Sequence, residues 1–215
     1  MGRSMSAPTE TSTKTDGRHA RGESSRARIV AAMLDLVTAG DIHPSAAKVA
    51  EAAGVGMRTV FHHFNDMDSL YREMSLAITA RVTPLFKAPL VAQNWQDRIR
   101  ETAQRRMQAF EIVSPYRVSA SIKRFQSDFL MKDFQRLVRR ERTAVEILLP
   151  PAARADTQRT NMLLIALSFH TWRMLRQEQQ LSVDDAEQVM LGLVNAVLMQ
   201  FDSSPQGPAG QASPC

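Results

Sequence analysis

The stretch SAAKVAEAAGVGMRTVFHHF, residues 45–64, decides the fold of this 215-residue chain. Its first half is dominated by alanine, and a helix with few bulky side chains lets a second helix approach closely. Gly54 stands where the chain must turn, and a turn with positive φ is least costly at glycine. Val55 follows as an apolar plug. The stretch therefore predicts a helix-turn-helix, whose second helix enters the DNA major groove.

The second helix, residues 57–64, divides into two faces when each residue advances by about 100°. Val60 and Phe64 fall on the face turned to the core, with His63 beside them. Arg58 and His62 project from the opposite face, and arginine can bond both O6 and N7 of guanine. The candidate DNA-binding residues of the whole stretch are Ser45, Lys48, Met57, Arg58, Thr59, Phe61, His62 and His63.

The flanking candidates would contact the DNA backbone or a base edge. Thr59 can donate to a phosphate oxygen, and Phe61 can touch a thymine methyl group or a sugar. Ser45 can cap its helix and contact the backbone, and Lys48 can pair with a phosphate. Each residue also has a purely structural interpretation, because alanine-rich helices followed by glycine occur in many helical proteins that do not bind DNA. Taken in isolation, Arg58 is more often a solvated arginine than a base reader.

The adjacent histidines His62 and His63 do not predict a metal site. Neighbouring helical residues point about 100° apart, so their rings cannot easily bind one ion. We interpret His63 as a packed or backbone-bonded histidine. No metal and no cofactor are expected.

The composition limits the class of protein. Hydrophobic residues make up 44% of the chain, and Cys215 is the only cysteine, so no internal disulfide can form. The N-terminus is polar, and no apolar run reaches the roughly 18 residues of a membrane span. A cytoplasmic protein without a membrane partner is expected. The net charge of +5 is no argument for DNA binding, since residues 1–64 hold eight Lys and Arg against six Asp and Glu.

Helical periodicity and the scarcity of glycine after Gly56 predict an all-α fold. Residues 1–24 and 203–215 lack periodicity and are expected to be a flexible arm and a disordered tail. Asn65 or Asp66 is expected to cap the helix that follows the helix-turn-helix. The other expected helices are 24–39, one from about 66 ended by Pro84, 95–113 stopped before Pro115, two within 117–149, 157–179, and 184–201 capped at Ser182.

The last two expected helices are unusually apolar. Residues 162–175 carry apolar side chains nearly all round their helix, and residues 190–201 carry a wide apolar stripe. A helix that is apolar on every side is buried on every side. The pattern alone leaves two interpretations open: a deep core, or a two-fold interface in which two helices from each subunit form a four-helix bundle.

Residues 25–75, taken in order, resemble the DNA-binding domain of the TetR family of transcriptional repressors. The resemblance implies a three-helix helix-turn-helix domain over 25–82, with its motif at 45–64. It also implies a larger helical ligand-binding and dimerisation domain over 83–202, where only the layout is similar. The matching segments are Arg28–Ala32, Gly40, Val49–Val55, Thr59–Phe64 and Leu70.

This resemblance implies a homodimer that binds a pseudo-palindromic operator in double-stranded DNA. It further implies repression that ends when a small-molecule effector binds. The chain departs from the family at Phe61, where Tyr is usual, and at Met67, where Lys is usual, so two phosphate contacts are missing. It also has Gly56 where Ser is often found. A compensating hypothesis is that the arm contacts the DNA backbone or the minor groove through Lys14, Arg18, Arg21 and Arg26.

Aromatic and methionine side chains in the second domain are candidates for an effector pocket, although such residues at helical spacing usually belong to a core. The candidates are Phe110, Phe125, Phe129, His170 and Trp172, with Met107 and Tyr116 as further options. The segment 117–142 holds eight basic and three acidic residues. It is interpreted as a solvated face, as a surface for an anionic ligand, or as a second DNA-facing surface.

The sequence therefore predicts a homodimeric DNA-binding transcriptional regulator, with Arg58 and His62 as the base readers. The first alternative is a helical small-molecule-binding protein of the same fold that has lost DNA binding. The second is an enzyme, which is disfavoured because the sequence shows no Ser/His/Asp set, metal-ligand spacing or glycine-rich phosphate loop.

Overall fold

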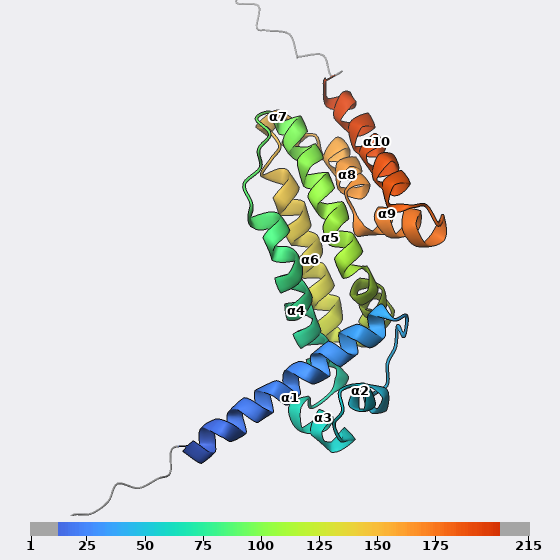
Figure 1. Cartoon of the computed structure of the whole chain (residues 1–215). Coiled ribbons are helices and arrows are strands. Elements are labelled where there is room, and N and C mark those ends of the chain that lie inside the picture. The colour runs from blue at the N-terminus through green and yellow to red at the C-terminus, as the bar shows by residue number, and fades with distance from the viewer. Residues whose placement is uncertain (1–12, 203–215) are drawn as a thin grey trace, which may run out of the picture. The chain divides into compact units, whose positions relative to one another are not determined.

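The computed structural model describes residues 13–202, with side chains for residues 22–201 (Figure 1). This described range is helical and holds no strand, which confirms the all-α prediction. The tail 203–215 and residues 1–12 of the expected arm lie outside the described residues. The helices are α1 (Thr13–Thr38), α2 (Ala46–Ala52), α3 (Met57–His63), α4 (Met67–Lys87), α5 (Trp95–Lys123), the 3₁₀ turn η1 (Arg124–Gln126), α6 (Asp128–Glu146), α7 (Pro151–Ala155), α8 (Thr157–Ala166), α9 (Phe169–Arg173), the π-helical turn η2 (Met174–Glu178) and α10 (Val183–Asp202).

The chain forms two compact units. Unit 1 contains the chain up to Ala77 together with Pro115–Leu130. Unit 2 contains Ile78–Ser114 together with the chain from Met131 on. We expected one boundary, between residues 82 and 83. In the structure a segment from the middle of the chain, Pro115–Leu130, also belongs to the N-terminal unit.

The helix-turn-helix forms for the local reasons that its sequence suggests. Ser45 caps α2 by accepting a hydrogen bond from the Lys48 backbone N–H at 3.3 Å. Gly54 has φ +62°, a conformation that a residue with a Cβ rarely adopts. Val49 and Val60 are buried, and α2 and α3 both pack against α1 (Figure 1).

The core of unit 1 consists of apolar side chains from α1 to α4, all almost completely buried: Ile29, Met33, Val37, Val49, Val60, Phe64, Leu70 and Met74. The start of α4 is capped as expected, because Asp66 Oδ1 accepts from the Ser69 backbone N–H at 2.7 Å. Periodicity and capping together therefore predicted α2, α3 and the start of α4 correctly.

Pro115–Leu130 is held in unit 1 by three side-chain contacts with the first turns of α4. The hydroxyls of Tyr71 and Ser119 hydrogen-bond at 2.8 Å, and both residues are fully buried. Ser127 donates to Asp68 Oδ2 at 2.7 Å while its own oxygen caps α6. The Arg72 guanidinium lies 4.4 Å from the centre of the Phe129 ring. These contacts make the middle segment an integral part of the unit.

Unit 2 is built around a second apolar core between α5, α6, α7, α8 and α10. Its most completely buried members are Ile99, Ala103, Val145, Leu163, Leu167, Val194 and Leu198. Ser182 caps α10 as expected, since its Oγ accepts from the Asp185 backbone N–H at 3.1 Å. Most of the expected helices are present, although several ends differ.

Two prolines do not end their helices, contrary to expectation. α4 continues through Pro84 to Lys87, and α5 continues through Pro115 to Lys123. A proline inside a helix removes one backbone hydrogen bond and kinks the axis at a cost of about 3 kcal/mol. Val113 and Tyr116, on either side of Pro115, are buried, and burial of their apolar surface stabilises this part of α5.

Two further helices differ from the sequence expectation. α1 begins at Thr13, so residues 13–24 of the expected flexible arm are helical; no proline interrupts the segment, and each glycine within it costs only about 1 kcal/mol relative to alanine. The expected helix 157–179 is broken at Leu167. There Ser168 caps a new helix, α9, by accepting from the Thr171 N–H at 3.2 Å. Side-chain capping of this kind competes with continuation of a helix.

Candidate nucleic-acid interface

α3 presents the side chains that the helical periodicity predicted. Met57, Arg58, Phe61 and His62 are exposed, while Val60 and Phe64 are buried. Phe61 is 48% exposed and Met57 is 53% exposed, which is unusual for large apolar side chains. Thr59 and His63 lie at the edges of this face and are half-buried. The outward face of α3 thus combines an arginine, a histidine and two apolar side chains.

The C-terminal end of α3 is fixed by Arg26 of α1. Its guanidinium donates to the His63 carbonyl oxygen at 2.9 Å and to Glu73 Oε1 at 2.8 Å. The same group lies 4.7 Å from the centre of the Phe64 ring. One side chain therefore joins α1, the last carbonyl of α3 and α4. A helix leaves its final carbonyls without intrahelical partners, and this contact satisfies one of them.

Arg26 differs from the other basic residues of the expected arm. The hypothesis of DNA contacts by the arm includes Arg26, but its guanidinium is engaged inside unit 1 by the His63 carbonyl oxygen and Glu73. The signal for its true role is its position on α1 three residues before the buried Ile29, one helical turn away on the same side. The side chains of Lys14, Arg18 and Arg21 lie outside the part of the chain that the structure describes.

Lys48 of α2 is exposed but forms an ion pair. Its Nζ lies 2.8 Å from Asp41 Oδ2. The hydrogen bond to Lys48 lowers the pKa of Asp41, and the same bond raises the pKa of Lys48. Both groups are consequently charged at neutral pH. A phosphate group approaching Lys48 would have to compete with this carboxylate.

His63 is packed against α1, as we interpreted it. A Cβ added at Gly22 would meet the His63 imidazole at 3.9 Å, so the ring lies next to the bare helix surface there. Burial lowers the pKa of His63, and the neighbouring His62 and Arg26 lower it further. The imidazole is therefore neutral at physiological pH and serves packing. Within the described residues, no three His, Cys, Asp or Glu side chains gather as metal ligands would.

The expected effector residues are divided between the two units. Phe125 and Phe129 belong to unit 1, where Phe125 is 73% exposed. Phe110 and Trp172 are buried in unit 2: the Phe110 ring lies 5.6 Å from the Phe169 ring, and Trp172 Nε1 donates to Glu111 at 2.8 Å. His170 is exposed, with its ring 6.2 Å from that of Phe134. The buried candidates have the contacts of ordinary core residues, and Met107 and Tyr116 are buried as well.

The fold of the chain is similar to that of a solved structure. The structure is similar to the crystal structure of a transcriptional regulator from Rhodococcus sp. Rha1, with a TM-score of 0.62 and 17% sequence identity over 84% of this chain and 99% of that chain. No family model matches the sequence, and no curated protein matches it. Between residues 13 and 202, no helix is both long enough and apolar enough to cross a bilayer.

Proposed function

We propose that this protein is a sequence-specific DNA-binding transcriptional regulator of the TetR type. It acts as a homodimer that represses transcription and is released by a small molecule. The observation that carries the proposal is the exposed face of α3, fixed in unit 1 by Arg26 on one side and by buried Val60 and Phe64 on the other. The similarity of fold to a transcriptional regulator agrees with it.

In this proposal Arg58 and His62 read base edges, and Met57 and Phe61 make apolar contacts such as those with thymine methyl groups. Thr59, Ser45 and Lys48 contact the backbone and fix the orientation of α3. His63 supports the helix rather than contacting DNA. We assign base contacts to the exposed side chains and support to the packed ones, because a side chain can touch a base only if it reaches beyond the domain surface.

The dimer proposal rests on apolar side chains that remain exposed on α8 and α10. One face of α10 is buried in unit 2 through Met190, Val194 and Leu198. The opposite face carries an exposed stripe of Val189, Gly192, Leu193, Ala196 and Met199, and Ile165 of α8 is 68% exposed. Each of the two interpretations of these apolar helices therefore accounts for one face. One face of α10 forms the core of unit 2, and the other fits a second copy of the chain.

The test of DNA binding is selection from a random duplex library with the full-length protein, followed by fluorescence anisotropy on the selected site. We expect a pseudo-palindromic site with a dissociation constant of about 10⁻⁸ M or lower. The chain's own upstream DNA serves as an independent probe. Binding that is equally weak on all sequences would favour the alternative of a fold relative that has lost specific DNA binding. The Lys48–Asp41 pair and the absence of a hydroxyl at Phe61 would weaken contacts with the DNA backbone, and so would lower the overall affinity.

Sedimentation equilibrium tests the dimer. Leu193→Asp combined with Ile165→Asp should convert the dimer to monomer, because each change places a charge in an apolar contact. Val138→Asp is the matched control, since Val138 is an exposed apolar residue on α6 of the same unit. A wild-type monomer at micromolar concentration would refute the dimer proposal.

A further inference from the structure

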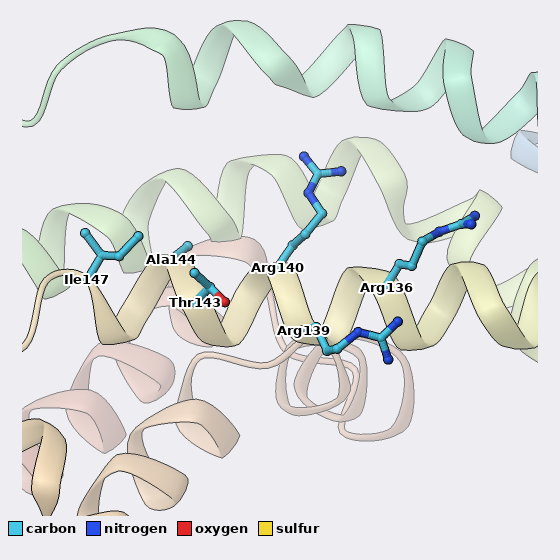
Figure 2. Close-up of a pocket in the computed structure, with 6 residues that line it drawn as sticks. All are labelled: Arg136, Arg139, Arg140, Thr143, Ala144 and Ile147. Atoms are coloured by element: carbon cyan, nitrogen blue, oxygen red, sulfur yellow. The ribbon is translucent and has the colours of Figure 1, made fainter.

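The outward face of α6 forms an open groove that the proposed function does not use. Its volume is about 480 Å³, and it opens widely to solvent, so a ligand there would be covered on one side only. Figure 2 shows the charged and the uncharged lining residues gathered at opposite ends of this face. The lining residues are Arg136, Arg139 and Arg140 at one end and Thr143, Ala144 and Ile147 at the other.

The positive charge at the arginine end of the groove is only partly neutralised by carboxylates. Arg136 pairs with Asp133 at 2.9 Å, but in the described part of the chain Arg139 and Arg140 have neither an ion pair nor a hydrogen bond from their guanidinium groups. Like charges three and four residues apart destabilise a helix. An anion bound between the guanidinium groups would remove this repulsion.

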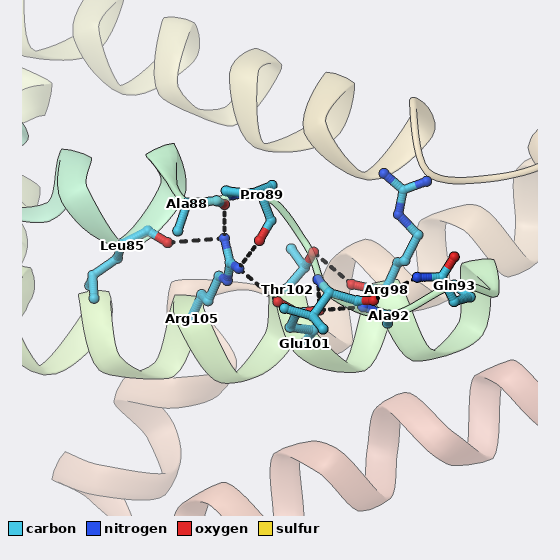
Figure 3. A network of polar contacts seen from close by, with 10 residues as sticks. Leu85, Ala88, Pro89, Ala92, Gln93, Arg98, Glu101, Thr102 and Arg105 are labelled. Carbon is cyan, nitrogen blue, oxygen red and sulfur yellow. Dashed lines mark hydrogen bonds and ion pairs between the residues drawn. The ribbon is translucent and has the colours of Figure 1, made fainter.

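Two other arginines of unit 2, Arg105 and Arg142, bind charged or polar partners. The Arg105 guanidinium donates to the carbonyl oxygens of Leu85, Ala88 and Pro89 and forms an ion pair with Glu101 at 2.7 Å (Figure 3). Arg142, on another side of α6, pairs with Glu146 at 2.8 Å and with Asn161 at 3.0 Å. Arg139 and Arg140, by contrast, have no such partner in the described part of the chain.

The uncharged end is apolar and accessible. Ile147 is 69% exposed, and Ala144 and Thr143 beside it are exposed as well. Arg140, Thr143, Ala144 and Ile147 share one side of the helix, because they recur at spacings of three and four residues. At a rise of about 1.5 Å per residue, the axial distance from Arg140 to Ile147 is about 10 Å.

We propose that this groove binds an amphipathic organic anion, a carboxylate with an unbranched apolar chain. The carboxylate accepts two parallel hydrogen bonds from Arg140, which lies on the same side of α6 as the apolar end, and Arg139 on the adjoining side adds electrostatic attraction. The chain lies along Ala144 and covers Ile147. Since a C–C bond is about 1.5 Å long, a chain of about eight to ten carbons matches the length of the groove. The inference concerns binding alone and holds whether or not the protein binds DNA.

Isothermal titration calorimetry of the full chain with decanoate, kept below its micelle-forming concentration, tests the proposal. R139Q/R140Q should weaken binding about tenfold or more, because charge-assisted hydrogen bonds to the carboxylate are lost. Ile147→Asn should weaken binding several-fold by removing apolar contact with the chain. Arg98→Gln is the matched control, since Arg98 is an exposed arginine of unit 2 on α5, and it should bind like the wild type (Figure 3).

Three further probes define the ligand class. Decanol and inorganic phosphate should each bind at least tenfold more weakly than decanoate, because each offers only half of the proposed contacts. Vesicles containing phosphatidylglycerol distinguish a free amphiphile from a lipid surface, and we expect no binding to them. Equal affinity of wild type and R139Q/R140Q for decanoate, equal affinity for phosphate and decanoate, or binding to the vesicles alone would each overturn the proposal. Circular dichroism of every variant verifies that the helices are retained.

Discussion

α3 and α6 both present arginine to solvent, but the two helices are supported in different ways. α3 is a short helix with one exposed arginine, and buried Phe64 and the Arg26 contact fix it. α6 is much longer and exposes three neighbouring arginines, two of which form no ion pair or guanidinium hydrogen bond within the described chain. Base recognition needs a side chain whose position is set to within a fraction of an ångström, and neighbouring residues provide that support. We infer that support, more than charge, distinguishes the face of α3 that we propose for DNA binding.

The largest expected effect concerns the apolar anchor of α3. Phe64→Ala should lower the free energy of unfolding by about 3–5 kcal/mol, because it opens a cavity beneath α3. Phe125→Ala is the matched change in the same unit, and it should alter stability by less than about 0.5 kcal/mol since Phe125 is largely exposed. Urea unfolding of the two variants measures the difference. Similar losses for both would mean that α3 is not anchored as described.

Arg58→Ala should cost about 1–3 kcal/mol of binding free energy at one base position in each half-site. Arg140→Ala should leave DNA affinity unchanged, because we assign that residue to the groove of α6. Anisotropy on the selected operator and on single-base variants of it provides the measurement. If Arg58→Ala weakened binding equally on every sequence, Arg58 would contact phosphate instead of a base. A loss for Arg140→Ala would abolish the distinction between the two helices.

Arg26→Gln tests support without removing a DNA contact. We expect a loss of about 1–2 kcal/mol in stability, since the guanidinium is partly exposed and its bonds are partly screened. DNA affinity measured on the folded variant should also fall, because the end of α3 is released from α1 and α4. Arg26→Lys can restore the ion pair with Glu73 but not both bonds together, so it should recover only part of the affinity. Normal affinity of a folded Arg26→Gln protein would contradict the positioning role.

The smallest expected effect is a change in salt dependence. Asp41→Asn releases Lys48 from its ion pair, and the freed ammonium can then neutralise a phosphate. The slope of log K against log salt should become steeper by about 0.9 for that contact. Asp41→Asn should leave the selected operator sequence unchanged, because phosphate contacts carry no sequence information. An unchanged slope would mean that Lys48 does not reach DNA.

Local signals predicted unit 1 well because they act over a few residues. Ser45, Gly54 and Asp66 work within one turn of the chain, and the spacing of Val60 and Phe64 fixes which side of α3 faces inward. Such features depend on backbone geometry that the sequence itself determines. The all-α class followed from the same signals.

Features that depend on distant residues could not be predicted. Pro115 remains within α5 because its neighbours are buried by packing, and no local signal reveals that burial. In the sequence nothing distinguishes Arg26 from the other basic residues of the arm. In the structure it donates hydrogen bonds to His63 and Glu73, which follow it by 37 and 47 residues. The aromatic residues expected in an effector pocket also belong to two separate units, and the groove of α6 contains no aromatic residue.

The assembly of unit 1 from two separate stretches has a consequence for how the protein can be made and recombined. During synthesis the N-terminal unit stays incomplete until Leu130 has been added, because Tyr71 and Asp68 bond partners that follow them by 48 and 59 residues. A hybrid protein that joined residues 1–82 to a foreign domain would leave Tyr71 without the Ser119 hydroxyl and without the neighbouring Tyr116 ring. Grafts that carry Pro115–Leu130 along with the helix-turn-helix keep the unit whole.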